Sequence, residues 1–215
     1  MAKQHKNLVS FGIWSGIALL VAVPVVLATT SPYLGYRSMA YIIGGFAGIL
    51  ALALFLLQPL LALGALPGVN KAHSRLCHRW VGASIVVAVL LHVGGLYLTS
   101  PADTVDALLL VSPTAFSIYG VIAMWGVVFT AVLVVCRRRL RLRYSTWQLV
   151  HNGLALVVVI STVIHAVMIQ GAMEEISKWV LCLAVLATTT GALVLHWVVK
   201  PLSRRRRLDR KALSD

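Results

Sequence analysis

Carboxylates are scarce in this sequence, which has six Asp and Glu among 215 residues and none inside its long hydrophobic segments. Proton pumps and ion-coupled carriers place ionisable groups within the membrane, so the sequence disfavours both classes. Cysteine is also scarce. Cys77, Cys136 and Cys182 form no Cys-x-x-Cys pair, and three thiols at unrelated spacings indicate neither a disulfide framework nor a zinc site.

Hydrophobic residues are abundant instead, at 60% of the chain, against roughly 45–50% in a soluble domain. They concentrate in six stretches of about 20 residues, the length at which a helix crosses a ~30 Å hydrocarbon core. We therefore predict an all-α integral membrane protein with a bundle of six transmembrane helices. The stretches are approximately Leu8–Ala28, Tyr41–Leu63, Trp80–Leu98, Phe116–Cys136, Leu149–Ile169 and Trp179–Val199.

The formal net charge of +13 does not indicate nucleic-acid binding, because the basic residues lie in short clusters between the hydrophobic stretches. Seventeen of the 19 Lys and Arg residues fall on one side if the N-terminus is cytoplasmic, and only Arg37 and Lys178 fall on the other. The positive-inside rule then places both termini in the cytoplasm. We expect residues 1–200 to form the six-helix domain and residues 201–215 a basic cytoplasmic tail attracted to anionic lipid.

Four of the seven histidines show a repeated spacing. His78 and His92 bracket most of the third stretch, His151 and His165 bracket most of the fifth, and both pairs are 14 residues apart. Fourteen residues turn a helix by ~1400°, only ~40° short of four full turns, so both members of a pair face one side. Because the third and fifth stretches run in the same direction, His78 is level with His151, and His92 with His165.

Two stacked pairs of imidazoles between two helices are what bis-histidine ligation of two haem irons requires. Zinc would need three or four converging ligands, and a solitary membrane histidine usually bonds to a neighbouring carbonyl or hydroxyl. We prefer this ordinary interpretation for His5, His73 and His196. For the four paired residues we predict metal and cofactor binding, with two b-type haems expected.

Arg75 and Arg79 lie next to His78 and are candidate partners for haem propionates, although topology-setting charge explains them about as well. Glycines close to the candidate ligands would let a flat macrocycle approach the backbone, or they could mediate ordinary helix contacts. They are Gly82, Gly94, Gly95 and Gly153.

The segments His78-Arg79-Trp80-Val81-Gly82 and Trp147-Gln148-Leu149-Val150-His151-Asn152 resemble the ferric reductase-like transmembrane family. That family includes the membrane part of NADPH oxidases and the haem subunit of the periplasmic methionine-sulfoxide reductase system. The resemblance covers about residues 72–199, and it implies haem ligation by His78, His92, His151 and His165. The methionine-sulfoxide system's subunit often lacks a histidine at the position of His78, so this chain looks more like the two-haem members.

The resemblance implies a cytochrome b of the bacterial inner membrane that transfers electrons to an extracytoplasmic acceptor, either a ferric chelate or a partner periplasmic reductase. No Gly-x-Gly-x-x-Gly follows a predicted strand. We therefore expect flavin or quinone to act through a partner or a surface site, with a soluble flavin reductase or membrane quinol as donor. Two alternatives stay open: a single-haem subunit that donates to a periplasmic reductase, and a non-catalytic membrane anchor.

Overall fold

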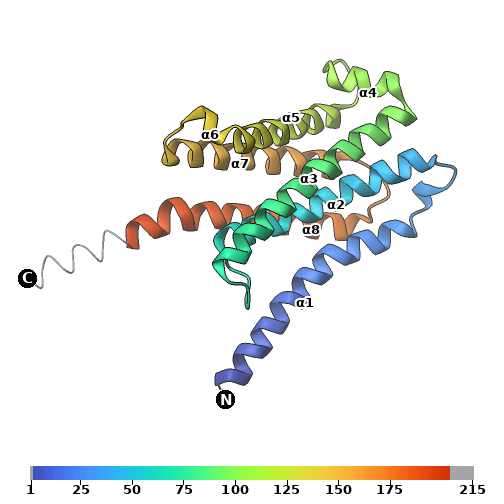
Figure 1. The fold of residues 1–215 in the computed structure, drawn as a ribbon. Coiled ribbons are helices and arrows are strands. Elements are labelled where there is room, and N and C mark those ends of the chain that lie inside the picture. Colours follow the sequence, from blue (N-terminus) through green and yellow to red (C-terminus); the bar gives the residue numbers. More distant parts are fainter. Residues whose placement is uncertain (1, 204–215) are drawn as a thin grey trace, which may run out of the picture.

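The computed structural model describes residues 2–203, and all regular structure in this range is helical (Figure 1). Six helices are long and apolar enough to cross a bilayer, which confirms the predicted fold class. They are α1 (Ala2–Thr29), α2 (Met39–Leu63), α3 (Lys71–Thr99), α5 (Ala115–Val135), α7 (Tyr144–Met168) and α8 (Glu175–Val194). The side of the membrane on which each end lies stays a prediction, and residues 204–215 of the expected tail lie outside the described residues.

Short helices occupy the connections. The 3-10 helix η1 (Pro32–Leu34) follows α1, α4 (Pro101–Leu108) follows α3, and α6 (Arg137–Leu140) precedes α7. A π-helical segment, η2 (Leu195–Val199), continues α8. Helix α4 lies in the longest of these connections, residues 99–115, and ends at Leu108.

Capping determines where α3 begins. Gly64 ends α2 in the left-handed conformation, with φ of 63°, and the Asn70 side chain accepts hydrogen bonds from the backbone N–H groups of Ala72 and His73. The helix therefore begins at Lys71, nine residues before the predicted start of the hydrophobic stretch at Trp80. As a result, His78 lies about two turns inside a regular helix, which fixes the direction of its side chain.

The bundle is built from two helix pairs that lie side by side (Figure 1): α2 packs along α3, and α5 packs along α7. Gly44 and Gly95 bring α2 and α3 into backbone contact, since a Cβ added at Gly95 would lie 2.6 Å from the Ala40 carbonyl oxygen. In the other pair, Gly126 of α5 makes room for the side chain of Val158 of α7, because an added Cβ would lie 2.5 Å from a methyl of Val158.

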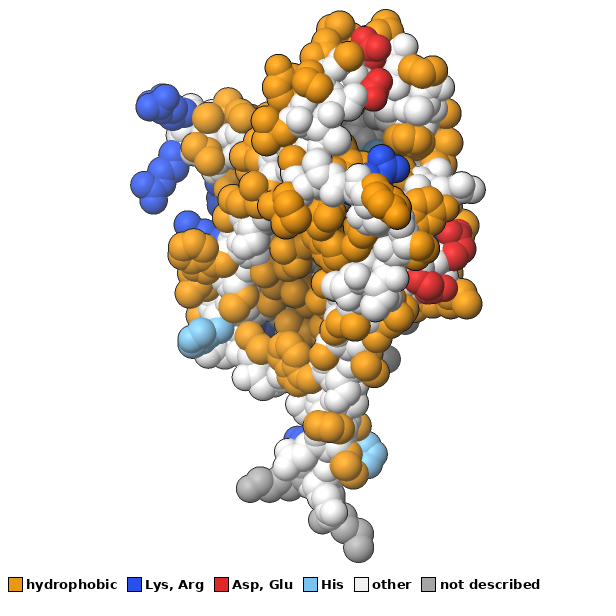
Figure 2. All heavy atoms as spheres, turned by 90° about the vertical axis from the view of Figure 1, so that its right-hand side faces the viewer, with side chains coloured by type: hydrophobic (Ala, Val, Ile, Leu, Met, Phe, Trp, Pro, Cys, Tyr) orange, Lys and Arg blue, Asp and Glu red, His pale blue; other side chains and the backbone are white. Residues whose placement is uncertain are grey.

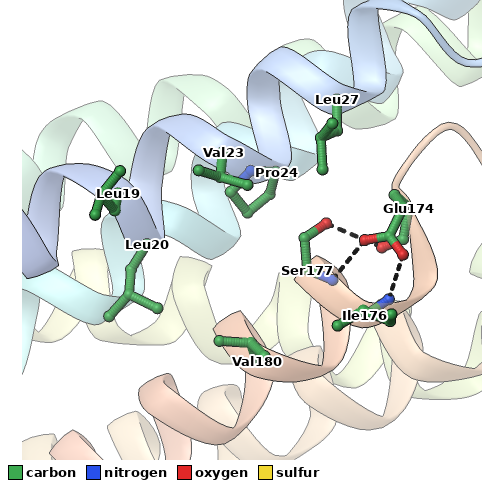
Figure 3. Close-up of a pocket in the computed structure, with 9 residues that line it drawn as sticks. All are labelled: Leu19, Leu20, Val23, Pro24, Leu27, Glu174, Ile176, Ser177 and Val180. Carbon is green, nitrogen blue, oxygen red and sulfur yellow. Dashed lines mark hydrogen bonds between the residues drawn. The ribbon is translucent and has the colours of Figure 1, made fainter.

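Helix α8 joins the two pairs by packing on α2 and α7, and its buried residues complete the hydrophobic core. All five of these helices contribute to the core, which includes Leu52, Leu56, Ile85, Val127, Val158, Val159, Leu181 and Val185. Helix α1 contacts mainly α2 and α8, and it leans away from the bundle toward its N-terminal end (Figure 1). Near the other end of α1, an apolar cavity of about 410 Å³ lies between it and α8 (Figure 3).

The charges separate along the bundle. We call the end where α3 and α7 begin the basic end, because Lys71, Arg75, Arg79 and the arginines of 137–143 lie there. The four acidic residues within the described range, Asp103, Asp106, Glu174 and Glu175, lie at the opposite end. Figure 2 looks from the side of the bundle on which α4 lies, and hydrophobic side chains dominate it, with acidic side chains in small groups.

Candidate functional site

Two pairs of histidines face each other between α3 and α7. The rings of His78 and His151 have centroids 6.3 Å apart near the basic end, and their planes cross at 66°. The rings of His92 and His165 have centroids 6.3 Å apart toward the opposite end, with an interplanar angle of 81°. The structure therefore brings together all four histidines that the 14-residue spacing selected, at two matched levels.

The common centroid distance fits one metal ion held between two imidazoles. A five-membered ring with bonds of about 1.33 Å places each nitrogen about 1.1 Å from the ring centroid. A metal–imidazole bond adds about 2.0–2.1 Å. Two such arms in line span about 6.2–6.4 Å, which matches both pairs.

Backbone carbonyls orient three of the four rings. The Nδ1 atoms of His92 and His165 lie 2.8 Å from the carbonyl oxygens of Gly44 and Phe116. The Nδ1 atom of His78 lies 3.1 Å from the carbonyl oxygen of Gln58. A carbonyl oxygen can only accept, so each Nδ1 carries the proton and donates it. The second nitrogen, Nε2, is then left to bind a metal, as in most metal-ligating histidines.

Glycines on the neighbouring helices lie against the two rings at the outer level. A Cβ added at Gly48 would lie 2.8 Å from Nδ1 of His92, and one added at Gly120 would lie 2.7 Å from Cε1 of His165. Each glycine follows by four residues the residue whose carbonyl accepts from that ring, Gly44 or Phe116. One turn of α2 and one turn of α5 thus hold the two rings in the same way.

The glycines named from the sequence have other surroundings. Gly95 makes the helix contact with α2, and a Cβ at Gly82 would lie 3.2 Å from the amide nitrogen of Gln58. A Cβ added at Gly94 or Gly153 meets no described atom within 4 Å. Sequence reasoning missed the glycines of α2 and α5, because only the folded structure shows which helices lie beside α3 and α7.

The surroundings of His151 differ from those of the other three rings. Its Nδ1 is buried, with no hydrogen-bond partner among the residues that the structure describes. Trp147, one turn earlier on α7, stacks on it with ring centroids 5.1 Å apart and planes at 11°. The guanidinium carbon of Arg137 lies 4.4 Å from the centroid of the Trp147 ring, a cation–π contact.

The remaining candidates are Arg75, Arg79, His5, His73 and His196. Arg75 and Arg79 are exposed on α3 and form no ion pair within the described range, so their role stays a prediction. His5 and His73 are also exposed. His196 bonds to the side chain of Gln148 at 2.7 Å, a contact between η2 and α7 that the sequence did not indicate.

The ligand set restricts the metal. Across residues 2–203, no three side chains of His, Cys, Asp or Glu converge on one point. Each level therefore offers two imidazoles, which is too few for a structural or catalytic zinc site. Two axial imidazoles suit a metal whose other ligands come from a planar macrocycle.

Comparison with known protein families assigns the fold. Residues 47–162, more than half of the chain, match the ferric reductase like transmembrane component. The chain belongs to this family. Membership implies transmembrane electron transfer, and members typically bind haem b. Neither the curated proteins nor the solved structures include a significant match to this ferric reductase-like chain.

The match begins in α2, earlier than the resemblance placed at residues 72–199, and it ends before that range does. It includes His78, His92 and His151. His165 lies three residues beyond it, so the case for this residue depends on the geometry of its pair with His92.

Proposed function

We propose that this ferric reductase-like protein binds two b-type haems, one between His78 and His151 and one between His92 and His165, and carries single electrons across the membrane. The observation on which this depends is the 6.3 Å separation of the ring centroids in both pairs, which matches two imidazoles on one metal. Bound haem supplies the one-electron Fe(III)/Fe(II) couple.

The protein's own contribution is to place two redox centres at fixed depths. Within α3, the 14 residues from His78 to His92 span ~21 Å along the helix axis. The two levels would therefore lie at different depths of a hydrocarbon core ~30 Å thick. The carbonyls of Gly44, Phe116 and Gln58 fix ring direction and make the imidazoles better donors to a metal. The apolar core between the helices limits the access of water to the half-buried rings.

The direction of transfer follows from the charges. By the positive-inside rule the basic end faces the cytoplasm, and electrons enter there from a soluble flavin reductase or from membrane quinol. They leave at the opposite end for a ferric chelate or a periplasmic reductase. The bacterial inner membrane is the location that fits these partners.

Absorption spectra of the purified protein, oxidised and dithionite-reduced, test the proposal together with a haem-to-protein ratio. The expected ratio is two, with spectra of bis-histidine b-type haem. His92→Ala or His165→Ala removes one haem, and His78→Ala or His151→Ala removes the other. His73→Ala is the matched control, because this histidine is exposed on the same helix as His78 and His92.

The alternatives give different results. A ratio near one in the unsubstituted protein favours a single-haem subunit that serves a periplasmic reductase. A colourless protein favours a membrane anchor. Retention of both haems by all four variants contradicts the assignment of the ligands.

A further inference from the structure

One of the four paired histidines lacks the hydrogen bond that the other three make. The Nδ1–H groups of His78, His92 and His165 donate to backbone carbonyls of neighbouring helices. The Nδ1 atom of His151 is enclosed by the protein and has no partner within residues 2–203. A histidine that donates this N–H is a more basic ligand for a metal. His151 is therefore the least basic of the four as a ligand.

A cation reaches the His151 ring through an aromatic stack. Trp147 stacks on His151 with ring centroids 5.1 Å apart, and the guanidinium carbon of Arg137 lies 4.4 Å from the centroid of the Trp147 ring. The midpoint between the rings of His78 and His151 is half of 6.3 Å, or about 3.2 Å, beyond the His151 centroid. These three steps place the positive charge of Arg137 within about 13 Å of that midpoint.

The charges at the two ends of the bundle act in the same direction. Among residues 2–203, no Lys or Arg at the basic end forms an ion pair. The opposite end holds the four acidic residues of the described range, and Lys178, one of its two basic residues, is paired with Glu175. All four paired histidines are half-buried, so burial does not distinguish the two levels. The level of His78 and His151 is thus the more electropositive one.

Reduction of a haem iron adds one electron and lowers the charge of the centre by one. Nearby cations and weakly donating ligands therefore favour the reduced form. We propose that His151 and the Arg137–Trp147 stack give the haem at the basic end the higher midpoint potential of the two. This inference depends on the proposed function, because it requires haem at both levels. Arg137 and Trp147 are positioning residues that act through His151, and electrons that enter at the basic end first occupy the centre that holds them more tightly.

Spectroelectrochemical titration of the purified protein tests the order of the two potentials. His92→Ala keeps only the centre at the basic end, and His78→Ala keeps only the other centre, so the two variants assign the two transitions. We expect the centre in His92→Ala to have the larger reduction equilibrium constant, by about 10-fold or more, which is ~59 mV for one electron. Coincident transitions or the reverse order overturn the inference, but they leave two haems and therefore leave the proposed function intact.

Arg137→Gln removes the cation from the stack. A unit charge about 13 Å away changes the reduction equilibrium constant up to about 9-fold at an effective dielectric constant of ~20, and less where solvent screens it. We expect a decrease of about 3- to 9-fold, or ~28–56 mV, for the centre at the basic end and no change for the other. Arg139→Gln is the matched control, because Arg139 is exposed on the same short helix and lies over no aromatic ring in the described range. Equal shifts in the two variants would overturn the role of the stack.

Nuclear magnetic resonance of the dithionite-reduced protein, labelled with nitrogen-15 histidine, reports on the hydrogen bonds directly. A low-spin Fe(II) haem with two axial imidazoles is diamagnetic, so the Nδ1–H protons of all four ligands can be observed. Three should show the downfield shift of a hydrogen-bonded N–H, and a fourth, missing from His151→Ala, should not. Four downfield signals would show that His151 has an acceptor and would overturn the inference. A protein that takes up no haem overturns both the inference and the proposed function.

Discussion

The imidazoles of His92 and His165 face each other with centroids 6.3 Å apart, and each donates its Nδ1–H to the helix that packs beside its own. The acceptors are the carbonyls of Gly44 on α2 and Phe116 on α5, at 2.8 Å in both cases. The pairs α2–α3 and α5–α7 thus use the same device to present one ring each. The proposed metal centre would therefore depend on two helices that contribute no ligand.

Alanine at Gly48 or Gly120 should weaken haem binding at this level. The added Cβ would lie 2.8 Å from the His92 ring or 2.7 Å from the His165 ring, and each ring is tied by its hydrogen bond. Overpacking of this kind costs about 1–3 kcal/mol. We expect the haem-to-protein ratio of either variant to fall from two toward one.

Gly45→Ala is the control. Gly45 lies on the same helix as Gly48, and a Cβ added there meets no described atom within 4 Å. It should keep both haems and be neutral or slightly stabilising, since alanine favours helix by about 0.8–1.0 kcal/mol over glycine. Full haem content and an unchanged spectrum in both Gly48→Ala and Gly120→Ala would show that these glycines do not hold the His92 and His165 rings in place.

Lys178 should contribute to stability although it lies in the first turn of a membrane helix. Its side chain is 3% exposed, and its Nζ donates to the Ile169 carbonyl at the end of α7 and pairs with Glu175. Lys178→Met leaves that carbonyl without its donor, a loss of about 1–3 kcal/mol. The midpoint of thermal unfolding in detergent should fall by about 2–4 °C for each kcal/mol.

Glu175→Gln removes the ion pair of Lys178 and keeps its hydrogen bond to the Ile169 carbonyl, so it tests the two contacts separately. The Glu175 side chain is 63% exposed, so its ion pair is screened and contributes little. We expect a much smaller change in unfolding temperature than for Lys178→Met. Equal effects of the two substitutions would show that the ion pair, and not the bond to Ile169, holds Lys178 in place.

The sequence predicted the elements that depend on local properties. Hydrophobic length located all six spanning helices, and the 14-residue spacing selected four histidines that the structure places in two facing pairs. It did not predict the contacts that depend on helix packing. The roles of Gly48 and Gly120 follow from α2 lying along α3 and α5 along α7, and no local pattern encodes that adjacency.

The lack of a hydrogen-bond partner for Nδ1 of His151 could not be predicted from the sequence either. A Trp-x-x-x-His spacing predicts that the two side chains share a helix face, because four residues make about one turn. Whether a carbonyl of a neighbouring helix reaches Nδ1 depends on how closely that helix approaches, which no local pattern encodes. The start of α3 was also predicted nine residues late, because hydropathy placed it at Trp80 and the helix begins after the Asn70 cap.

The N-terminus of α8 should loosen in acid. Backbone N–H groups of Ser177 and Ile176 donate to the Glu174 carboxylate and hold its pKa below its usual value (Figure 3). A depressed folded-state pKa means that this stabilisation is complete above the unfolded-state pKa and is lost as the pH falls through the folded-state pKa. Amide hydrogen exchange at Ile176 and Ser177 should therefore gain protection as the pH rises through that range, after correction for intrinsic exchange.

Glu174→Gln should remove this pH dependence, because an amide does not titrate in the range. Exchange in the middle of α8, at Leu181 and Val185, is the internal control, since these buried residues lie beyond the first turn. A pH dependence that persists in Glu174→Gln would assign the effect to another group.

Single-cysteine labelling tests the orientation that the direction of electron transfer requires. Basic residues gather where α3 and α7 begin, and the positive-inside rule places that end in the cytoplasm. In a background with Cys77, Cys136 and Cys182 replaced by Ala, Ala102→Cys reports on the α4 end and Ser145→Cys on the basic end, since both positions are exposed. A membrane-impermeant maleimide should label Ala102→Cys in spheroplasts and Ser145→Cys only after permeabilisation. The reverse pattern would leave the paired histidines as they are but would place the electron donor outside the cytoplasm and the acceptor within it.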